Sequence, residues 1–176
     1  ALTAVEAAKD NEELARVDQA LAAMKPQNTA GVQLALATAA LRRGNRDAAR
    51  QAIESALTAD PKSASAHLFV GTLRLADKDV PKAREEFKAA AELSPPRSVH
   101  RLRYAQFQMN SADVDGAVTT LKGVTAAAPD YLPAWLLLAE ISLGKKEYDE
   151  ALRLLTNILN RDPDNRLLER GPRRRL

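Results

Sequence analysis

Four prolines recur along the chain at a constant spacing. Pro61, Pro95, Pro129 and Pro163 follow one another at intervals of 34 residues. A fixed period of roughly 20 to 50 residues is typical of proteins assembled from stacked copies of one unit. The prolines therefore predict a chain built from similar units, each of which packs against its neighbours in sequence.

The copies agree at further positions once each is counted from the same point. We count them from Ala30, Ala64, Ser98 and Leu132, and we refer to the place of a residue within its copy as its repeat position. Small residues recur at repeat position 8 (Ala37, Gly71, Ala105 and Ala139) and at repeat position 20 (Ala49, Ala83, Ala117 and Ala151). Larger apolar residues recur at position 24 (Ile53, Phe87, Leu121 and Leu155), with Ala56, Ala90, Val124 and Ile158 three residues later. Because residues three and four apart share one face of a helix, this pattern predicts amphipathic helices.

Each copy divides into two helices, because its middle carries turn residues. Asn and Asp occur there and can cap the second helix by accepting hydrogen bonds from its free N–H groups. The expected helices are 30–43 and 47–59, 64–77 and 81–93, 98–111 and 115–127, and 132–144 and 148–160. The proline of each copy follows the second helix and ends it, since proline lacks the N–H that continuation requires.

The period also predicts the domain organisation. The four complete copies span residues 30–63, 64–97, 98–131 and 132–165, after a partial copy at 1–29 whose second helix is expected at 11–24. Residues 1–8 are expected to be the remainder of that copy's first helix. Residues 166–176 begin a further copy and end in an arginine-rich tail. The chain begins without Met or a signal peptide, so we expect a piece of a longer protein that is cut inside a repeat at both ends.

Composition excludes several classes of protein. The aromatic content is only 4%, so Ala and Leu must fill most of the core, and no run of 18 apolar residues predicts a membrane-spanning segment. The net charge is +3, but residues 166–176 hold five Arg and one Glu, a charge of +4 that leaves −1 for residues 1–165. The expected folded part is therefore not basic, and we expect no nucleic-acid partner. Cysteine is absent, which leaves a cytoplasmic and a periplasmic or envelope location equally open.

The sequence contains no recognisable catalytic, cofactor or metal site. Cysteine is absent, so a catalytic thiol and a thiolate zinc site are excluded. The two histidines, His67 and His100, have no acid or cysteine at metal-ligand spacing, and His67 is expected to be a partly buried packing residue. The serines lack a glycine-rich elbow, and no phosphate-binding glycine loop is present. We therefore expect a protein without enzymatic activity, cofactor or bound metal.

The repeat pattern resembles the tetratricopeptide repeat, a helix–turn–helix unit of 34 residues. The copy at 132–165 is the closest match, with Trp135, Ala139, Tyr148, Ala151, Leu155 and Pro163 at the signature positions of the family. The pattern departs from the family at repeat position 4 (Gln33, His67 and Arg101) and at position 11 (Ala40, Arg74, Gln108 and Ser142), where large apolar or aromatic residues are usual. The resemblance, to bacterial-type arrays in particular, implies an all-α, right-handed solenoid of antiparallel helix pairs. The departures predict slightly looser packing within each pair.

The same resemblance implies that the first helix of each copy lines an inner, concave surface. Rows of residues at repeat positions 5, 9 and 12 then form a candidate groove for a peptide or helix of a partner protein. The groove residues are Leu34, Thr38, Leu41, Leu68, Thr72, Leu75, Leu102, Gln106, Met109, Leu136, Glu140 and Leu143. The alternative is that the leucine rows are core residues packed between adjacent first helices. The two alternatives differ in the exposure of these side chains.

The sequence supports two functions of different kinds. The first is a protein-interaction scaffold that binds a partner in this groove; the side chains of a carboxylate clamp are absent, so a partner held by its C-terminal carboxylate is not expected. The second is a structural or assembly segment of a larger bacterial envelope, secretion or polysaccharide-export protein. In that case self-association is expected through the helix at 11–24 or through the last helix.

Overall fold

The chain folds into helices joined by short turns. The computed structural model describes residue 5 and residues 7–24 and 29–161. The helices of this part of the chain are α2 (Asn11–Ala23), α3 (Ala30–Arg42), α4 (Arg46–Ala59), α5 (Ala64–Ala76), α6 (Val80–Glu92), α7 (Val99–Asn110), α8 (Val114–Ala127), α9 (Leu132–Gly144) and α10 (Tyr148–Arg161). Each boundary lies within one residue of its predicted position. The prediction of an all-α array of helix pairs is confirmed, whereas most of the expected helix at 1–8 and the tail at 166–176 lie outside the described residues.

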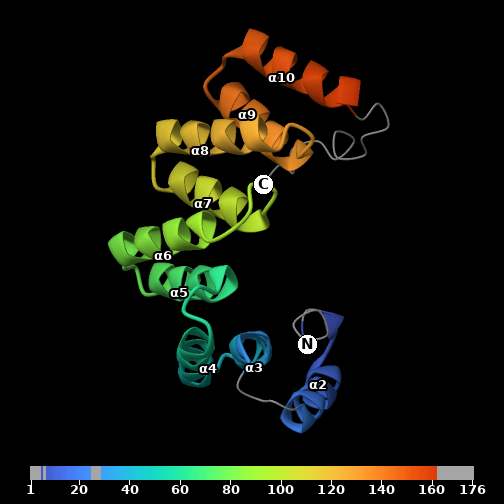
Figure 1. The fold of residues 1–176 in the computed structure, drawn as a ribbon, viewed down its shortest axis with the longest axis vertical. Helices are drawn as coiled ribbons and strands as arrows, with labels where there is room; N and C mark the ends of the chain where they lie inside the picture. The colour runs from blue at the N-terminus through green and yellow to red at the C-terminus, as the bar shows by residue number, and fades with distance from the viewer. Residues whose placement is uncertain (1–4, 6, 25–28, 162–176) are drawn as a thin grey trace. The chain divides into compact units, whose positions relative to one another are not determined.

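The helices are distributed over two compact units. Unit 1 spans Ala1–Ser94 and unit 2 spans Pro95–Leu176. In unit 1, α3 pairs with α4 and α5 pairs with α6, while α2 packs on α3 and α4 packs on α5 (Figure 1). In unit 2, α7 pairs with α8 and α9 pairs with α10, and α8 packs on α9 (Figure 1). Each unit therefore contains two helix–turn–helix pairs joined through the second helix of one pair and the first helix of the next.

Small residues allow the two helices of each pair to approach closely. All residues at repeat positions 8 and 20 are buried, as the sequence pattern predicts. Gly71 on α5 faces Phe87 on α6, and a Cβ atom at Gly71 would lie 3.2 Å from the Phe87 ring. The other pairs have Ala at position 8 and Ile or Leu at position 24. The smallest residue at position 8 is therefore matched with the largest residue at position 24.

The turns inside the pairs share one backbone geometry that the sequence analysis did not identify. Repeat position 15 has a positive φ in all four copies, at Gly44, Lys78, Ala112 and Lys146, with φ between 61° and 75°. The N–H of the next residue donates to the carbonyl at position 11, over 2.8–2.9 Å in each copy. This bond closes the first helix in the manner of a Schellman motif. In three copies the same residue, Asn45, Asp79 or Asp113, also caps the second helix with its side chain.

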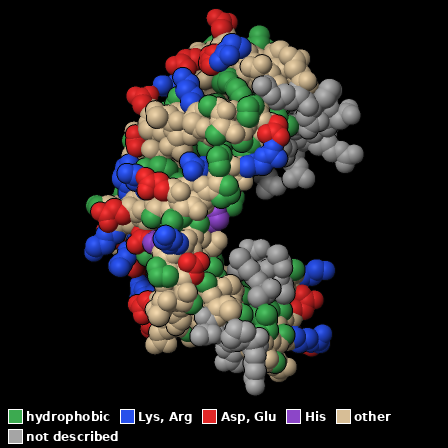
Figure 2. All heavy atoms as spheres, viewed as in Figure 1, with side chains coloured by type: hydrophobic (Ala, Val, Ile, Leu, Met, Phe, Trp, Pro, Cys, Tyr) green, Lys and Arg blue, Asp and Glu red, His purple; other side chains and the backbone are tan. Residues whose placement is uncertain are grey.

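Charged side chains of both signs cover the outside of the helices. On the face shown in Figure 2, Lys and Arg are interspersed with Asp and Glu over the described helices, so neither sign forms a continuous patch on that face. Within residues 7–24 and 29–161, the structure contains no helix that is long and apolar enough to traverse a lipid bilayer.

Candidate functional site

The predicted groove residues all lie on the first helices of the pairs. Residues 34–75 of this set belong to α3 and α5 of unit 1, and residues 102–143 belong to α7 and α9 of unit 2. The leucines at repeat position 5 differ in burial: Leu34 and Leu102 belong to core clusters, whereas Leu68 and Leu136 are half-buried. The position 5 row therefore contains core as well as surface residues.

The row at repeat position 12 is the most exposed of the apolar rows. Leu75 on α5 and Leu143 on α9 are 43% and 49% exposed, and Leu41 and Met109 are half-buried. Leu136 and Leu143 lie on α9 with Glu140 between them in sequence, and Glu140 is exposed as well. Within unit 2, this part of α9 therefore presents two apolar side chains and one carboxylate at the surface.

The polar row at repeat position 9 has fewer free hydrogen-bonding groups than its sequence suggests. The hydroxyls of Thr38 and Thr72 each donate to the carbonyl four residues earlier in the same helix, over 2.8 Å. Gln106 accepts a hydrogen bond from Arg103 at 3.2 Å. The two threonines can therefore offer a ligand only acceptor lone pairs, while Glu140 offers a carboxylate.

Three of the residues at repeat position 4 are hydrogen-bond donors, namely His67 and Arg101, which depart from the family pattern, and Trp135, which matches it. His67 Nε2, Arg101 Nε and Trp135 Nε1 lie 3.1, 3.2 and 2.8 Å from the carbonyl oxygen of the proline six residues earlier in each case. These prolines are Pro61, Pro95 and Pro129, which lie two or three residues after the second helix of the preceding copy. Three different side chains thus make the same bond, which gives a partner to a backbone carbonyl in the connection between two copies.

Gln108 replaces the aromatic residue usual at repeat position 11 and is buried. Its amide donates to Asp113 at 3.2 Å, and its carbonyl oxygen accepts from Thr120 at 2.8 Å. A buried amide is tolerated when its groups are hydrogen-bonded. The sequence predicted looser packing where polar residues replace large apolar ones. At Gln108, and at position 4 in His67 and Arg101, these polar side chains form hydrogen bonds instead of apolar contacts.

The two histidines each have a partner inside their own unit. His67 Nδ1 lies 2.7 Å from Glu86 in unit 1, and His100 Nδ1 lies 2.8 Å from the hydroxyl of Ser98 in unit 2. Burial lowers the pKa of His100, because it disfavours the charged imidazolium. Among the described residues, no three His, Asp or Glu side chains come together as they would around a metal ion.

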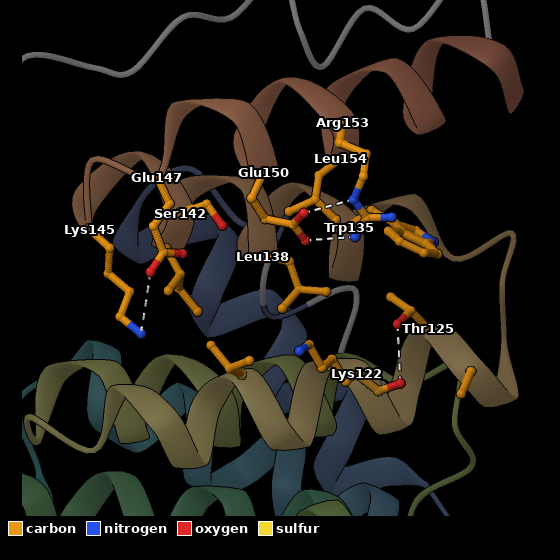
Figure 3. A pocket seen from close by; sticks show the side chains of 13 residues that line it. Lys122, Thr125, Trp135, Leu138, Ser142, Lys145, Glu147, Glu150, Arg153 and Leu154 are labelled. Atoms are coloured by element: carbon orange, nitrogen blue, oxygen red, sulfur yellow. Dashed lines mark hydrogen bonds and ion pairs between the residues drawn. The ribbon is translucent and has the colours of Figure 1, made fainter.

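A pocket in unit 2 lies between α8 and α10, over α9, with a volume of about 450 Å³. Its walls include the side chains of Lys122, Trp135, Leu138, Arg153 and Leu154. Figure 3 shows Trp135 from α9 and Arg153 from α10 extending toward the same end of the pocket. The repeat pattern identified Trp135 as a signature residue of the family, but it did not predict this pocket, because the walls come from three different helices.

Ion pairs surround the mouth of the pocket. Arg153 donates from Nε and Nη2 to the two carboxylate oxygens of Glu150, each over 2.7 Å. The hydrogen bonds from Arg153 lower the pKa of Glu150, and the positive charges of Arg153 and Lys122 act in the same direction. The same pair raises the pKa of Arg153. Both groups are therefore ionised at neutral pH.

Comparisons of sequence and structure place this chain among known repeat proteins. Two models of the tetratricopeptide repeat match the sequence, one over residues 34–98 and the other over residues 74–141 and 121–170. No protein with a curated description matches the sequence.

Several solved structures share the fold. A crystal structure of MamA has a TM-score of 0.63 and 16% identity, over 86% of this chain and 87% of that one. YrrB, described as a TPR protein with an unusual peptide-binding site, has a TM-score of 0.59 and 20% identity, over 89% of this chain and 79% of that one. The Cut9–Hcn1 hetero-tetramer of the APC/C has a TM-score of 0.66 and 18% identity, over 89% of this chain and 29% of that one.

At these identities the structural similarity shows the fold alone, whereas the sequence models together extend over residues 34–170. Tetratricopeptide repeat proteins typically mediate protein–protein interactions and are generally not enzymes. The matched residues include the helix pairs from α3/α4 to α9/α10. The chain belongs to the tetratricopeptide repeat family.

Proposed function

We propose that this protein is a non-catalytic scaffold that binds a peptide or helix of a partner protein on the exposed side of its first helices. The observation that supports this most directly is the exposure of Leu75 and Leu143 at repeat position 12. A leucine side chain gains about 1.5–3 kcal/mol when it is transferred from water to an apolar contact, so covering these leucines would favour binding. YrrB, a structural neighbour described as having a peptide-binding site, offers a precedent in the same fold.

The surface of α9 in unit 2 is the part of this side that we assign first. Leu136 and Leu143 would hold the apolar side chains of a partner, and the carboxylate of Glu140 would accept hydrogen bonds or pair with a basic residue. Met109 on α7 adds a flexible side chain that adapts to different partners. Leu34 and Leu102 are buried in core clusters and are left out of the proposed contact surface.

The proposal can be tested by site-specific crosslinking. The full chain, carrying a photoreactive amino acid in place of Glu140, would be irradiated in native lysate of the source organism and the linked polypeptides identified by mass spectrometry. We expect one defined crosslinked partner, and we expect its yield to fall at least tenfold in a Leu136→Glu/Leu143→Glu variant.

The matched control is Val80→Glu, which places the same charge on a partly exposed residue at the start of α6. This variant should crosslink as well as the unmodified chain. Equal crosslinking by the α9 double variant, with its helical circular dichroism unchanged, would contradict the proposal.

A second candidate is assembly through the last helix, and exposed leucines on α10 favour it. Leu152 and Leu159 are 66% and 45% exposed. The residues at the equivalent repeat positions of α8 are Val118, which is half-buried, and Thr125, which is buried. Sedimentation velocity at increasing concentration would test this candidate: association is expected for the unmodified chain and should be lost in Leu152→Glu/Leu159→Glu, whereas a constant monomer mass for both would exclude it.

A further inference from the structure

The pocket of unit 2 is separate from the leucine surface of α9. Its walls are formed by α8, α10 and the side of α9 that carries Trp135, Leu138 and Ile141. The half-buried Leu136 and the exposed Glu140 and Leu143 do not line it. Its volume of about 450 Å³ lies in the range of sites that accommodate a small ligand or a few side chains of a peptide. The pocket is therefore a second possible binding site on the same unit.

Two of the three basic residues around the pocket already have acidic partners. Arg153 pairs with Glu150 through two hydrogen bonds of 2.7 Å. Lys145 lies 3.3 Å from Asp115 and 4.0 Å from Glu147. These pairs largely neutralise each other, so neither offers a full positive charge to an incoming ligand.

Lys122 is the basic residue that forms no direct ion pair with the described acidic residues, although its charge acts on Glu150 at a longer distance. Within residues 7–24 and 29–161, no carboxylate lies at ion-pair distance from its ammonium group. Figure 3 shows its side chain extending from α8 into the space beneath Leu138. A partner carboxylate that entered the pocket would therefore meet a cation that has no competing anion in direct contact.

The rest of the lining is suited to an aliphatic side chain. Leu138 and Leu154 contribute apolar surface at the base of the pocket, Val118 contributes more from α8, and the indole of Trp135 closes one end. The indole N–H is already used, because it donates to Pro129 at 2.8 Å. The ring therefore offers the pocket an apolar face rather than a donor.

Unit 1 contains an equivalent pocket in which a glutamate occupies the repeat position of Lys122. That pocket lies between α4 and α6, over α5, and has a volume of about 380 Å³. Glu54 occupies the repeat position of Lys122. The lining of this pocket also includes Glu86, which is paired with His67 at 2.7 Å. Arg74 also lines this pocket, so the two pockets differ in the charge at repeat position 25 and not in whether a basic residue is present. Glu54 would repel a ligand carboxylate from the place where Lys122 attracts it in unit 2.

We propose that the α8–α9–α10 pocket of unit 2 binds an acidic peptide segment of a partner, whose carboxylate pairs with Lys122 while a neighbouring aliphatic side chain contacts Leu138, Leu154 and Trp135. The occupant is a peptide in which an acidic residue adjoins an apolar one. The pocket selects it by the charge of Lys122, and Glu54 disfavours the same carboxylate in the equivalent pocket of unit 1.

Trp135 provides a direct readout, because it is the only tryptophan of the chain and it lines the pocket. The emission of the full chain would be titrated with a short capped peptide in which leucine and aspartate alternate with glycine. A matched peptide with lysine in place of aspartate serves as the reference ligand. We expect a saturable change in emission with the acidic peptide only, and a weaker affinity at higher ionic strength.

Variants then assign the binding to the pocket. Lys122→Glu should weaken binding of the acidic peptide about tenfold, because an attraction is replaced by a repulsion. Lys122→Gln should have a smaller effect in the same direction. Glu54→Lys makes the converse charge change in unit 1 and should leave the Trp135 response unchanged. The Leu136→Glu/Leu143→Glu variant should also retain it, which separates this site from the proposed function of the first helices.

Three results would overturn the proposal. One is an emission of Trp135 that does not respond to the acidic peptide at millimolar concentration. Another is an equal response to the aspartate and lysine peptides. The third is an unchanged affinity in Lys122→Glu, once circular dichroism shows that the variant is folded.

Discussion

The two units are built from the same repeat pattern but differ in how their cores are connected. In unit 2, buried residues from α7, α8, α9 and α10 form one continuous cluster that includes Leu121 and Leu138. In unit 1, many of the described buried residues fall into three smaller clusters, which only the partly buried Leu36 and Phe69 connect and in which alanine is the commonest residue. Because cooperativity in repeat proteins depends on contacts between neighbouring elements, a common pattern of repeats need not give equal coupling between the helices. We expect unit 2 to lose its structure as a single body and unit 1 to lose it in parts.

The largest expected effect comes from truncating the core at repeat position 24 in each unit. Leu121→Ala and Ile53→Ala each truncate a fully buried side chain, and each should lower the free energy of unfolding by about 2–5 kcal/mol. Leu121 lies in the continuous cluster of unit 2, so its removal should reduce amide protection in α7, α8, α9 and α10 together. Ile53 contacts residues of α3 and α5, and its removal should affect only that region. Hydrogen exchange with mass spectrometry measures the extent of each loss.

Two conservative substitutions serve as controls for this comparison. Leu121→Met and Ile53→Val change the volume little and should cost less than about 1.5 kcal/mol each. The proposed difference between the units fails if the loss of protection in Leu121→Ala stays within α8, or if Ile53→Ala exposes the whole of unit 1.

The next effect concerns the pairing of Gly71 with Phe87 in unit 1. A Cβ at Gly71 would lie 3.2 Å from the Phe87 ring, so Gly71→Ala should be less favourable in the natural background than in a Phe87→Leu background. We expect a coupling energy of about 1 kcal/mol from the double-mutant cycle, measured by urea unfolding. In unit 2 the corresponding residues are Ala105 and Leu121, which already have the sizes of the double variant. Strictly additive effects of the two substitutions would show that the ring moves aside without cost.

A smaller effect is expected at the turns with positive φ. Ala112 in unit 2 and Lys78 in unit 1 adopt φ values near 61°, a conformation that a Cβ disfavours and that glycine adopts readily. Ala112→Gly and Lys78→Gly should each raise the free energy of unfolding by about 0.5–1 kcal/mol, as measured by thermal unfolding. The control is Gly44→Ala, which should lower stability because Gly44 has the same backbone geometry. A decrease in stability in either glycine variant would show that the flexibility added to the unfolded chain outweighs the relief of strain.

The smallest effect is a pH dependence that originates in unit 2. Burial lowers the pKa of His100 in the folded protein below the ordinary value of 6.5. The unfolded chain then binds a proton that the folded chain does not, so stability should fall as the pH decreases through about 6.5 toward the lower folded pKa. We expect melting temperatures measured from pH 7.5 to 5.5 to fall less steeply for His100→Gln than for the unmodified chain. Identical slopes for the two proteins would show that His100 does not contribute.

The positions of the helices could be predicted from the sequence because local signals repeat four times. A proline follows each second helix within three residues, Asn or Asp begins that helix in the first three complete copies, and the small residues at positions 8 and 20 fix the register of each pair. The turn at position 15 was not predicted, because Lys78, Ala112 and Lys146 are not residues that indicate a positive φ. Only Gly44 carried that signal, and one glycine among four copies did not reveal a shared geometry.

The surface features were less predictable than the fold. The sequence placed Leu34 and Leu68 in the same row at repeat position 5, yet Leu34 belongs to a core cluster and Leu68 is half-buried. The burial of a residue at a given repeat position depends on its neighbours in three dimensions, which the period does not specify. The pocket beside Trp135 could not be predicted for the same reason, because its walls come from three helices. Its charge depends on which of the basic residues in its walls form ion pairs with acidic residues.

The bond between repeat position 4 and the preceding proline bears on how such a chain can grow. The donor follows the proline carbonyl by six residues at each of the three junctions, and His, Arg and Trp all reach it. A duplicated block of 34 residues would carry its own proline and its own donor, so every new junction would be complete as soon as it arose. An insertion of even one residue between the two would break that junction. Duplication of a whole copy would therefore preserve this hydrogen bond at every junction, whereas a change in the length of a connection would not.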